Sequence, residues 1–284
     1  MAESHSPPAL TRLVRQHDRD RFLTALFAPA AVREDLLALY AFNHEIAKTR
    51  EVVSEPVLGQ IRLQWWRETI DSIYAGAAVR HHEVATPLAA AIRGRGLSRA
   101  HVEALLAARD FDLGGEAPAS LAALEAYAEA SSARLVWLAL EALGERGEAA
   151  MAAGRAIGIA YALAGLLRAL PFHARMKRLY LPRDLCSDAG LRVEADVFEL
   201  RSSPALRRVV APVAAAAARQ LAQGRALRGA VPRAALPALL PGVLAAADLA
   251  RLARAGYDPF DRRLAGRDPR RSWRLTLAAL TRRY

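Results

Sequence analysis

The feature that most limits how this chain can fold is residues 148–174, the most apolar helix that the sequence predicts. Gly154, Gly158 and Gly165 recur along it at spacings that would let another helix or a ligand approach closely. Its most apolar part, residues 157–170, is interrupted by Arg168 and is too short to span a bilayer. We therefore expect a helix buried among other helices.

The rest of the chain also favours helix. It is rich in alanine, leucine and arginine and poor in β-branched runs and aromatic residues. No strand-length alternation and no internal repeat is evident. We predict an all-α fold with roughly ten helices around a shared core, in one domain over residues 10–284 that follows a flexible N-terminal tail at residues 1–9.

Proline, glycine and serine predict where individual helices begin and end. Pro56 suits the first turn of one helix and Gly76 its C-terminal stop. Ser98 and Ser120 are candidate N-caps, and Pro241 is expected to kink or divide a later helix together with Pro237. The remaining boundaries place helices near residues 10–28, 30–50, 87–94, 98–113, 120–144, 193–200, 204–224, 232–255 and 271–283, with a loop at residues 182–190.

The chain is strongly basic, with a formal net charge of +11 and a pI near 10.7. This charge fits either an arginine-rich soluble protein or one with an anionic membrane surface, a phosphorylated ligand or nucleic acid as its partner. No zinc-finger spacing or RNA-binding aromatic signature occurs, so no nucleic-acid partner is expected. The single Cys186 and the lack of an apolar signal core predict a cytoplasmic protein, with peripheral attachment to the inner membrane left open.

Common catalytic patterns are missing from the sequence. It has no phosphate-binding glycine loop and no G-x-S-x-G turn. His81 and His82 lack nearby carboxylates at metal-ligand spacing, and Asp18 and Asp20 lie among arginines, which predicts local ion pairs. These four residues do not predict a metal site.

Two segments carry candidate chemistry. The first is "YAFNHEIAKTRE" at residues 40–51, and the second is "GLLRALPFHARMKRLYLPRDL" at residues 165–185, which gathers Arg168, Arg175 and Arg178. Cations at the mouth of an apolar helical cavity would suit a diphosphate-bearing lipid. The alternative is a solvated helix end whose cations interact favourably with the helix dipole.

Long stretches of the chain resemble the squalene/phytoene synthase family. They include "LFAPAAVREDLLALYAFNHEI", "LQWWRETIDSIYAG", "ARDFDLGGEAPASLAALEAYAEASSARL" and "GLLRALPFHARMKRLYLPRDL", in the order and spacing of that family. The resemblance implies an isoprenoid-synthase-like helical bundle around a central cavity. It also implies a site where active members join two polyprenyl diphosphates, with magnesium held by two aspartate clusters on facing helices.

The aspartates that the resemblance implies are largely replaced. The first cluster falls on Ala47, Lys48 and Glu51, so a single carboxylate is left and Lys48 would repel a cation. Because both clusters lack most of their carboxylates, we expect no catalytic residue, no resident metal and no cofactor. Magnesium would be expected only if the chain were a prenyltransferase.

The second cluster is replaced more completely. It falls on Ala169 and His173, with Gly165 at the position of an asparagine. A neutral imidazole prefers softer metals than magnesium. Of this motif only Arg168 is retained.

A closer resemblance is to the non-catalytic complex I assembly factor 6 branch of the family and to its bacterial relatives. The C-terminal "YDPFDRRLAGRDPRRSWRLTLAALTRRY" is among the stretches that carry it. It implies a catalytically inactive protein that assists early assembly of respiratory complex I at the membrane surface, with membrane-arm assembly intermediates as partners. The lack of a recognisable mitochondrial presequence and the high alanine and arginine content predict a bacterial member of this branch.

Two alternatives remain open from the sequence. One is a prenyltransferase of the phytoene or squalene synthase type in isoprenoid biosynthesis, and the other is a module that binds a polyprenyl lipid without reaction. Tyr127, Arg168, Arg175 and Arg178 are the candidate ligand-binding residues, with the arginines expected near the cavity mouth. The helix near residues 271–283 would either dock on anionic lipid or pack against the bundle.

Overall fold

The computed structural model describes residues 9–53, 55–266 and 268–284. Within these ranges all regular structure is helical, which confirms the all-α prediction. Residues 1–8 of the expected tail lie outside the described residues, and Ala9 begins the first helix. The α-helices in chain order are α1 (Ala9–His17), α2 (Arg19–Ala25), α3 (Ala30–Ala47), α4 (Thr49–Val52), α5 (Pro56–Tyr74), α6 (Ala85–Arg95), α7 (Arg99–Gly114), α8 (Leu121–Ala128), α9 (Arg134–Ala142), α10 (Glu148–Arg175), α11 (Arg183–Asp188), α12 (Pro204–Ala226), α13 (Leu236–Leu239), α14 (Pro241–Arg254) and α15 (Arg271–Thr281).

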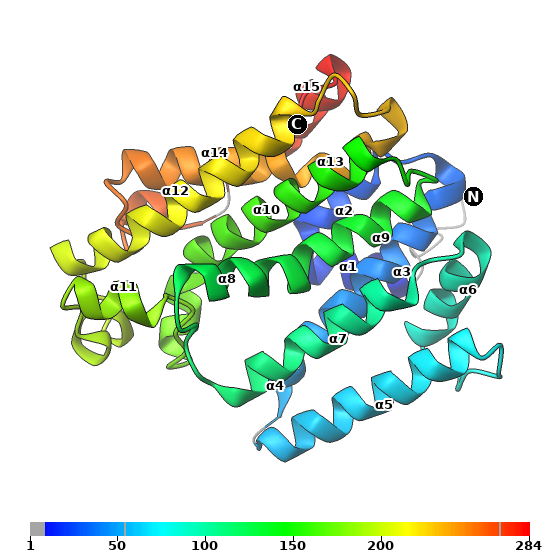
Figure 1. Ribbon diagram of the computed structural model, residues 1–284, viewed down its shortest axis with the longest axis horizontal. Coiled ribbons are helices and arrows are strands. Elements are labelled where there is room, and N and C mark those ends of the chain that lie inside the picture. Colours follow the sequence, from blue (N-terminus) through cyan, green and yellow to red (C-terminus); the bar gives the residue numbers. More distant parts are fainter. Residues whose placement is uncertain (1–8, 54, 267) are drawn as a thin grey trace, which may run out of the picture.

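Helix α10 is the centre of the bundle, as its composition predicts. It packs against α12, α14, α9 and the π-helical turn η1 (Glu129–Ala133). Figure 1 shows α12 and α14 along one side of α10 and the layers from α8–α9 through α7 to α5 along the other. At 28 residues α10 is long enough to cross a membrane, yet 67% of its most apolar window is buried inside the bundle. That burial is what a core helix of a helical bundle requires.

A close contact between α10 and η1 depends on Gly158. A Cβ atom at this position would lie 2.4 Å from the Cα of Ala133 and 2.9 Å from its backbone nitrogen. Gly165, two turns further along, faces open space, with no atom within 4 Å of such a Cβ. Gly158 of α10 therefore admits a neighbouring backbone, whereas a side chain at Gly165 would meet no described atom.

The structure corrects the prediction of one long helix at residues 120–144. Ser120 caps α8 as predicted, with its side chain accepting a hydrogen bond from the Ala123 amide. The helix then widens into η1, where the Ser131 hydroxyl donates to the Tyr127 carbonyl oxygen, before continuing as α9. A π-turn of this kind is common at functional sites.

Two other expectations about local structure need correction. The predicted loop at residues 182–190 contains α11, which starts after Pro182, whose φ of −59° leads into a helical turn. Ser98 occupies the N-cap position of α7, but its hydroxyl donates to the buried Glu141 carboxylate instead of capping the helix. Glu141 also accepts a bond from the Ser98 amide at 2.7 Å, so a distant carboxylate satisfies this helix end.

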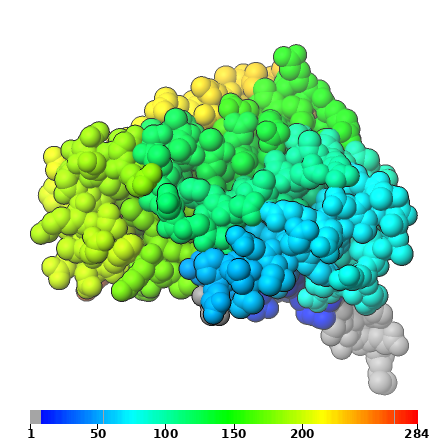
Figure 2. Space-filling view, turned by 60° about the horizontal axis from the view of Figure 1, so that its bottom comes forward, coloured from blue at the N-terminus to red at the C-terminus, as the bar shows by residue number. Residues whose placement is uncertain are grey.

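The helix expected at residues 232–255 is divided, as Pro237 and Pro241 predict. The 3₁₀-helix η3 (Arg233–Ala235) and α13 come first, and α14 follows at a bend of 43°. In the space-filling view of Figure 2, α5 lies at the front of the surface, and residues 183–200 form the opposite end of the same face.

Substitution of two glycines of α10 by alanine should have opposite effects on stability. We expect Gly158→Ala to lower the free energy of unfolding by about 1–3 kcal/mol, because the new methyl group collides with the backbone of η1. Gly165→Ala should raise the free energy of unfolding by about 0.5–1 kcal/mol, because alanine favours the helix more than glycine does and its methyl group has no described neighbour to collide with. Urea unfolding followed by circular dichroism measures both changes, and equal destabilisation by both variants would contradict this packing.

Candidate functional site

A buried carboxylate, Asp112 of α7, organises a polar cluster where α3, α7, α8 and the segment after α10 meet. The two oxygens of Asp112 are fully engaged. Oδ1 accepts hydrogen bonds from the hydroxyls of Tyr127 and Tyr180, each at 2.8 Å, and Oδ2 accepts one from Arg109 Nη1 at 3.2 Å. The Asp112 cluster consists of Asn43, Arg109, Asp112, Tyr127, Arg178 and Tyr180.

Two arginines complete the Asp112 cluster. Arg109 reaches across to α3 and donates from Nη2 to the Asn43 side-chain oxygen at 3.2 Å. Arg178 donates to the backbone oxygen of Asp112 at 3.4 Å. The cluster therefore ties α3, α7, α8 and the segment after α10 together, with Arg109 on the Asp112 carboxylate and Arg178 on the Asp112 backbone oxygen.

The tyrosines of the cluster act as hydrogen-bond donors. Burial, and then the negative charge of Asp112, raise the pKa of Tyr127 and of Tyr180 well above the ordinary value. Both phenols therefore keep their protons at physiological pH. A phenol that donates to a buried carboxylate oxygen replaces a hydrogen bond from water, and both tyrosines do so for Oδ1 of Asp112.

His173 and Glu51, from the two depleted motifs, lie at the edge of the cluster. The His173 ring packs on Tyr180 with ring centroids 4.7 Å apart. Burial, and then the nearby charge of Arg178, lower the pKa of His173 to about 4, so the imidazole is neutral at physiological pH. Glu51 has its pKa raised by burial and Asp112, against the opposing charge of Arg178.

At the first of the two motif positions, Lys48 takes part in ion pairing. Lys48 and Arg62 each donate to a different oxygen of the buried Glu45, Arg62 at 2.5 Å. Ala47 precedes Lys48 at the end of α3 and contributes no polar group. The remaining carboxylate, Glu51, lies on α4, where its side chain is partly desolvated by its neighbours and still reaches solvent.

These donors do not fit a magnesium cluster. Mg²⁺ takes hard oxygen ligands in near-octahedral geometry, whereas Gly165 and Ala169 offer none and His173 offers nitrogen. Over the described ranges no group of three or more His, Cys, Asp or Glu side chains is placed to hold a metal ion. The oxygens of Glu45 and Asp112 already accept bonds from cationic or phenolic donors, so the site is a closed hydrogen-bond network rather than an open set of ligands.

Arg168, whose side chain is 41% exposed, belongs to a second, partly buried ion network that joins α10 to α2, α14 and α15. It donates to Asp248 of α14 at 2.5 Å and to Asp20 of α2 at 3.3 Å. Arg271 of α15 bonds to both carboxylates, at 2.5 and 2.6 Å to Asp248. We call Asp20, Arg168, Asp248 and Arg271 the four-residue ion network. The expectation of purely local pairing is thus wrong for Asp20, although Asp18 does pair with Arg21 three residues away.

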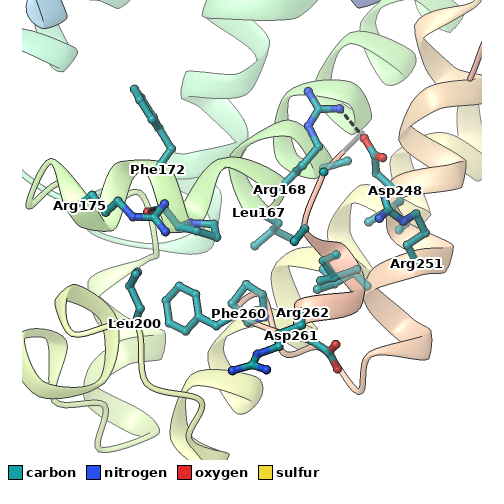
Figure 3. A pocket seen from close by; sticks show the side chains of 18 residues that line it. Leu167, Arg168, Phe172, Arg175, Leu200, Asp248, Arg251, Phe260, Asp261 and Arg262 are labelled. Atoms are coloured by element: carbon teal, nitrogen blue, oxygen red, sulfur yellow. Dashed lines mark hydrogen bonds and ion pairs between the residues drawn. The ribbon is translucent and has the colours of Figure 1, made fainter. Parts of the chain in front are cut away.

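A pocket of about 520 Å³ lies beside this network, between α10, α14 and residues 259–266. Figure 3 shows Leu167, Leu200 and Phe260 around the hollow, with the guanidinium of Arg168 directed to Asp248. Its wall is mainly apolar, and its cationic lining residues are Arg168, Arg175, Arg251 and Arg262. The pocket could hold the apolar part of a ligand with an anionic group near the arginines.

The structure divides the candidate ligand-binding residues between two places. Tyr127 and Arg178 belong to the Asp112 cluster, whereas Arg168 and Arg175 line the pocket. No sequence pattern predicted a role for Asp112, the residue at the centre of the cluster. The signal that could have found it is the oppositely charged pair Arg109 and Asp112, three residues apart on α7.

Comparison with known proteins gives a consistent assignment. The family model described as "Squalene/phytoene synthase" matches residues 14–277. The chain is 33% identical over 248 residues to NADH dehydrogenase (ubiquinone) complex I, assembly factor 6 of Bos taurus, which covers 87% of this chain and 74% of that protein. It is 26% identical over 259 residues to phytoene synthase of Rhodobacter capsulatus, covering 89% and 75% of the two chains.

The fold is shared with a solved synthase structure. A dehydrosqualene synthase in complex with ligand superposes with a TM-score of 0.83 over 96% of this chain and 94% of that chain, at 16% identity. At this level of identity the likeness concerns the arrangement of helices.

Asp20 should contribute to stability through the four-residue ion network. We expect Asp20→Asn to lower the free energy of unfolding by about 2–4 kcal/mol, because it leaves two guanidinium groups with one carboxylate at a mostly buried site. Asp110→Asn removes one member of an exposed pair with Arg67 and should cost less than about 1 kcal/mol. Urea unfolding at neutral pH compares the variants.

The effect of Asp20→Asn should also depend on pH. Burial would raise the pKa of Asp20, but the hydrogen bond from Arg271 and the charge of Arg168 outweigh it and lower the pKa. A lowered pKa in the folded state stabilises above the unfolded value of about 3.9, and this stabilisation is lost as the pH falls through the folded pKa. The difference between wild type and variant should therefore shrink in acid, and a difference that grows below pH ~4 would contradict the assignment.

Proposed function

The chain belongs to the squalene/phytoene synthase family, and from this premise we propose that it assists assembly of respiratory complex I without catalysing prenyl transfer. It acts at the cytoplasmic surface of the inner membrane, on early intermediates of the membrane arm, and needs no resident metal. The observation that carries the non-catalytic part is the engagement of Asp112 and Glu45 by arginine, lysine and tyrosine donors.

The chemistry of prenyl transfer explains why this observation matters. Loss of diphosphate from a polyprenyl substrate leaves a highly charged group, which divalent cations held by carboxylates must neutralise. A carboxylate that already accepts bonds from guanidinium and phenol groups can bind a metal only after those bonds are broken. The donor set at the Asp112 cluster therefore supports a retained fold without the metal-dependent reaction.

The assembly role rests on similarity. The chain matches assembly factor 6 with higher identity than it matches phytoene synthase, over nearly the same share of its length. Family membership alone would allow either activity, since one fold hosts several functions. The closer likeness, together with the depleted motifs, supports complex I assembly.

A prenyltransferase is the second candidate function. The retained Tyr127 and Arg168 favour it, together with the pocket of about 520 Å³ that Arg168 lines. Binding of a polyprenyl lipid without reaction is compatible with either function. The apolar pocket with Arg175 and Arg262 in its lining supports such binding.

Deletion of the gene should lower the amount and the NADH:ubiquinone oxidoreductase activity of complex I several-fold. The wild-type gene should restore both, and so should Glu51→Ala, because Glu51 holds no catalytic metal in this proposal. Blue-native gels and membrane NADH oxidation measure the effect. Normal complex I in the deletion strain would refute the assembly role.

A turnover assay separates the enzyme from the non-enzyme. Purified protein with magnesium and farnesyl or geranylgeranyl diphosphate should form no product, with a phytoene synthase as positive control. Sustained product formation that Arg168→Ala abolishes would establish the prenyltransferase instead.

Native mass spectrometry tests the lipid proposal. We expect a co-purified isoprenoid whose occupancy falls in Phe260→Arg, which introduces a charge into the apolar wall of the pocket. The matched control is Leu26→Arg, which should leave occupancy unchanged, since that side chain is half exposed and lies outside the pocket lining. A protein that carries no isoprenoid after gentle purification would rule this proposal out.

A further inference from the structure

Helix α15 presents an apolar stripe to solvent. Trp273, Leu277 and Leu280 are 69%, 50% and 77% exposed, and they follow one another at spacings of four and three residues. Residues at these spacings share one face of a helix. A Trp and two Leu side chains left in water on a single face mark an interaction surface.

The opposite face of α15 is fixed to the bundle. Leu275 and Ala278 are buried against α2 and α14, and Arg271 is tied to Asp20 and Asp248 in the four-residue ion network. At the C-terminus the buried Tyr284 accepts a bond from Arg225 at its backbone oxygen. Because one face is held in place, the exposed stripe has a defined direction relative to the rest of the molecule.

Basic residues flank the stripe at both ends. No acidic residue occurs between residues 269 and 284, which include five arginines. Arg270 precedes the stripe, Arg282 and Arg283 follow it, and all three side chains are exposed. None of the three forms an ion pair with any residue that the structure describes.

We propose that this face of α15 docks on an anionic lipid bilayer. Trp273, Leu277 and Leu280 enter the boundary between headgroups and acyl chains, and Arg270, Arg282 and Arg283 meet the lipid phosphates. Tryptophan is suited to this boundary because its ring is apolar and its N–H is polar. The proposal deepens the membrane-surface part of the proposed function and rests on it, by naming the surface and the lipid charge that it recognises.

Charge favours the bilayer over a second copy of the chain. Two α15 faces in contact would bring arginines of like sign together, with no acidic residue in that segment to neutralise them. An anionic membrane supplies the missing negative charge along its whole surface. The experiment must therefore distinguish membrane binding from self-association through the α15 face.

Co-flotation of the purified full-length protein with vesicles tests the proposal. We expect binding to phosphatidylcholine vesicles that contain phosphatidylglycerol, weak binding to phosphatidylcholine alone, and loss of binding in high salt. Trp273→Ala with Leu280→Ala should weaken binding by about tenfold or more. Arg270→Ala with Arg283→Ala should weaken binding by about tenfold on anionic vesicles only.

Matched controls keep the test specific. Leu58→Ala with Ile61→Ala removes two exposed apolar side chains from α5, at the edge of the bundle opposite α15 in Figure 1, and should bind like wild type. All substituted side chains are exposed, and far-UV circular dichroism should show unchanged helix content and melting. Equal loss of binding in the α5 control would overturn the assignment of the α15 face.

Other outcomes are equally decisive. Wild type that binds no vesicle, or Trp273→Ala with Leu280→Ala that binds as tightly as wild type, would overturn the proposal. A dimer in solution that this double variant converts to a monomer would show that the face serves self-association instead. Because these vesicles contain no protein, failure here leaves the complex I phenotype of the deletion strain untouched, so the two proposals fail separately.

Discussion

Ionic and hydrogen-bond pairing of buried carboxylates is the constraint on which the rest of this structure depends. An ionised carboxylate inside a helical bundle is unstable unless donors compensate for the water that it loses. Every buried acidic side chain in the described part of the chain has such donors. They are Glu45, Asp112, Glu141, Asp196, Asp248 and Asp258, each bonded to arginine, lysine, tyrosine, serine or backbone donors.

The same constraint links the two faces of α10 to function. On one face the Asp112 cluster holds α3, α7 and α8 together, and on another the four-residue ion network connects α2, α14 and α15. Carboxylates that serve as internal counter-ions are poor metal ligands, because a cation must compete with donors already in place. The fold of the family is thus stabilised by interactions in which the buried acidic side chains are paired. The network that holds α15 also fixes the direction in which the exposed face of α15 points.

Much of the fold could be predicted from local sequence. Pro56 and Ser120 start helices, Gly76 follows the end of one, and Gly158 admits a neighbouring helix, because these effects depend on the residue itself and on its nearest turns. The loop predicted around Cys186 was wrong, and the long helix predicted at residues 120–144 is continuous over residues 121–142 but contains the π-turn η1. In both regions contacts with distant segments, such as the bond from Arg183 to the Pro118 carbonyl, contribute to the backbone path.

The sequence by itself determined that this is an all-α chain of the squalene/phytoene synthase family, because helical periodicity and residue identity can be read along the chain. Only the tertiary structure decided which charges meet. Asp112 takes partners from α7, α8 and the segment after α10. Asp20 pairs with Arg271 across 251 residues, and Arg168 and Arg178 belong to different sites. Such pairings are set by how helices pack in space, and a carboxylate buried among them takes whichever donor that packing brings within reach.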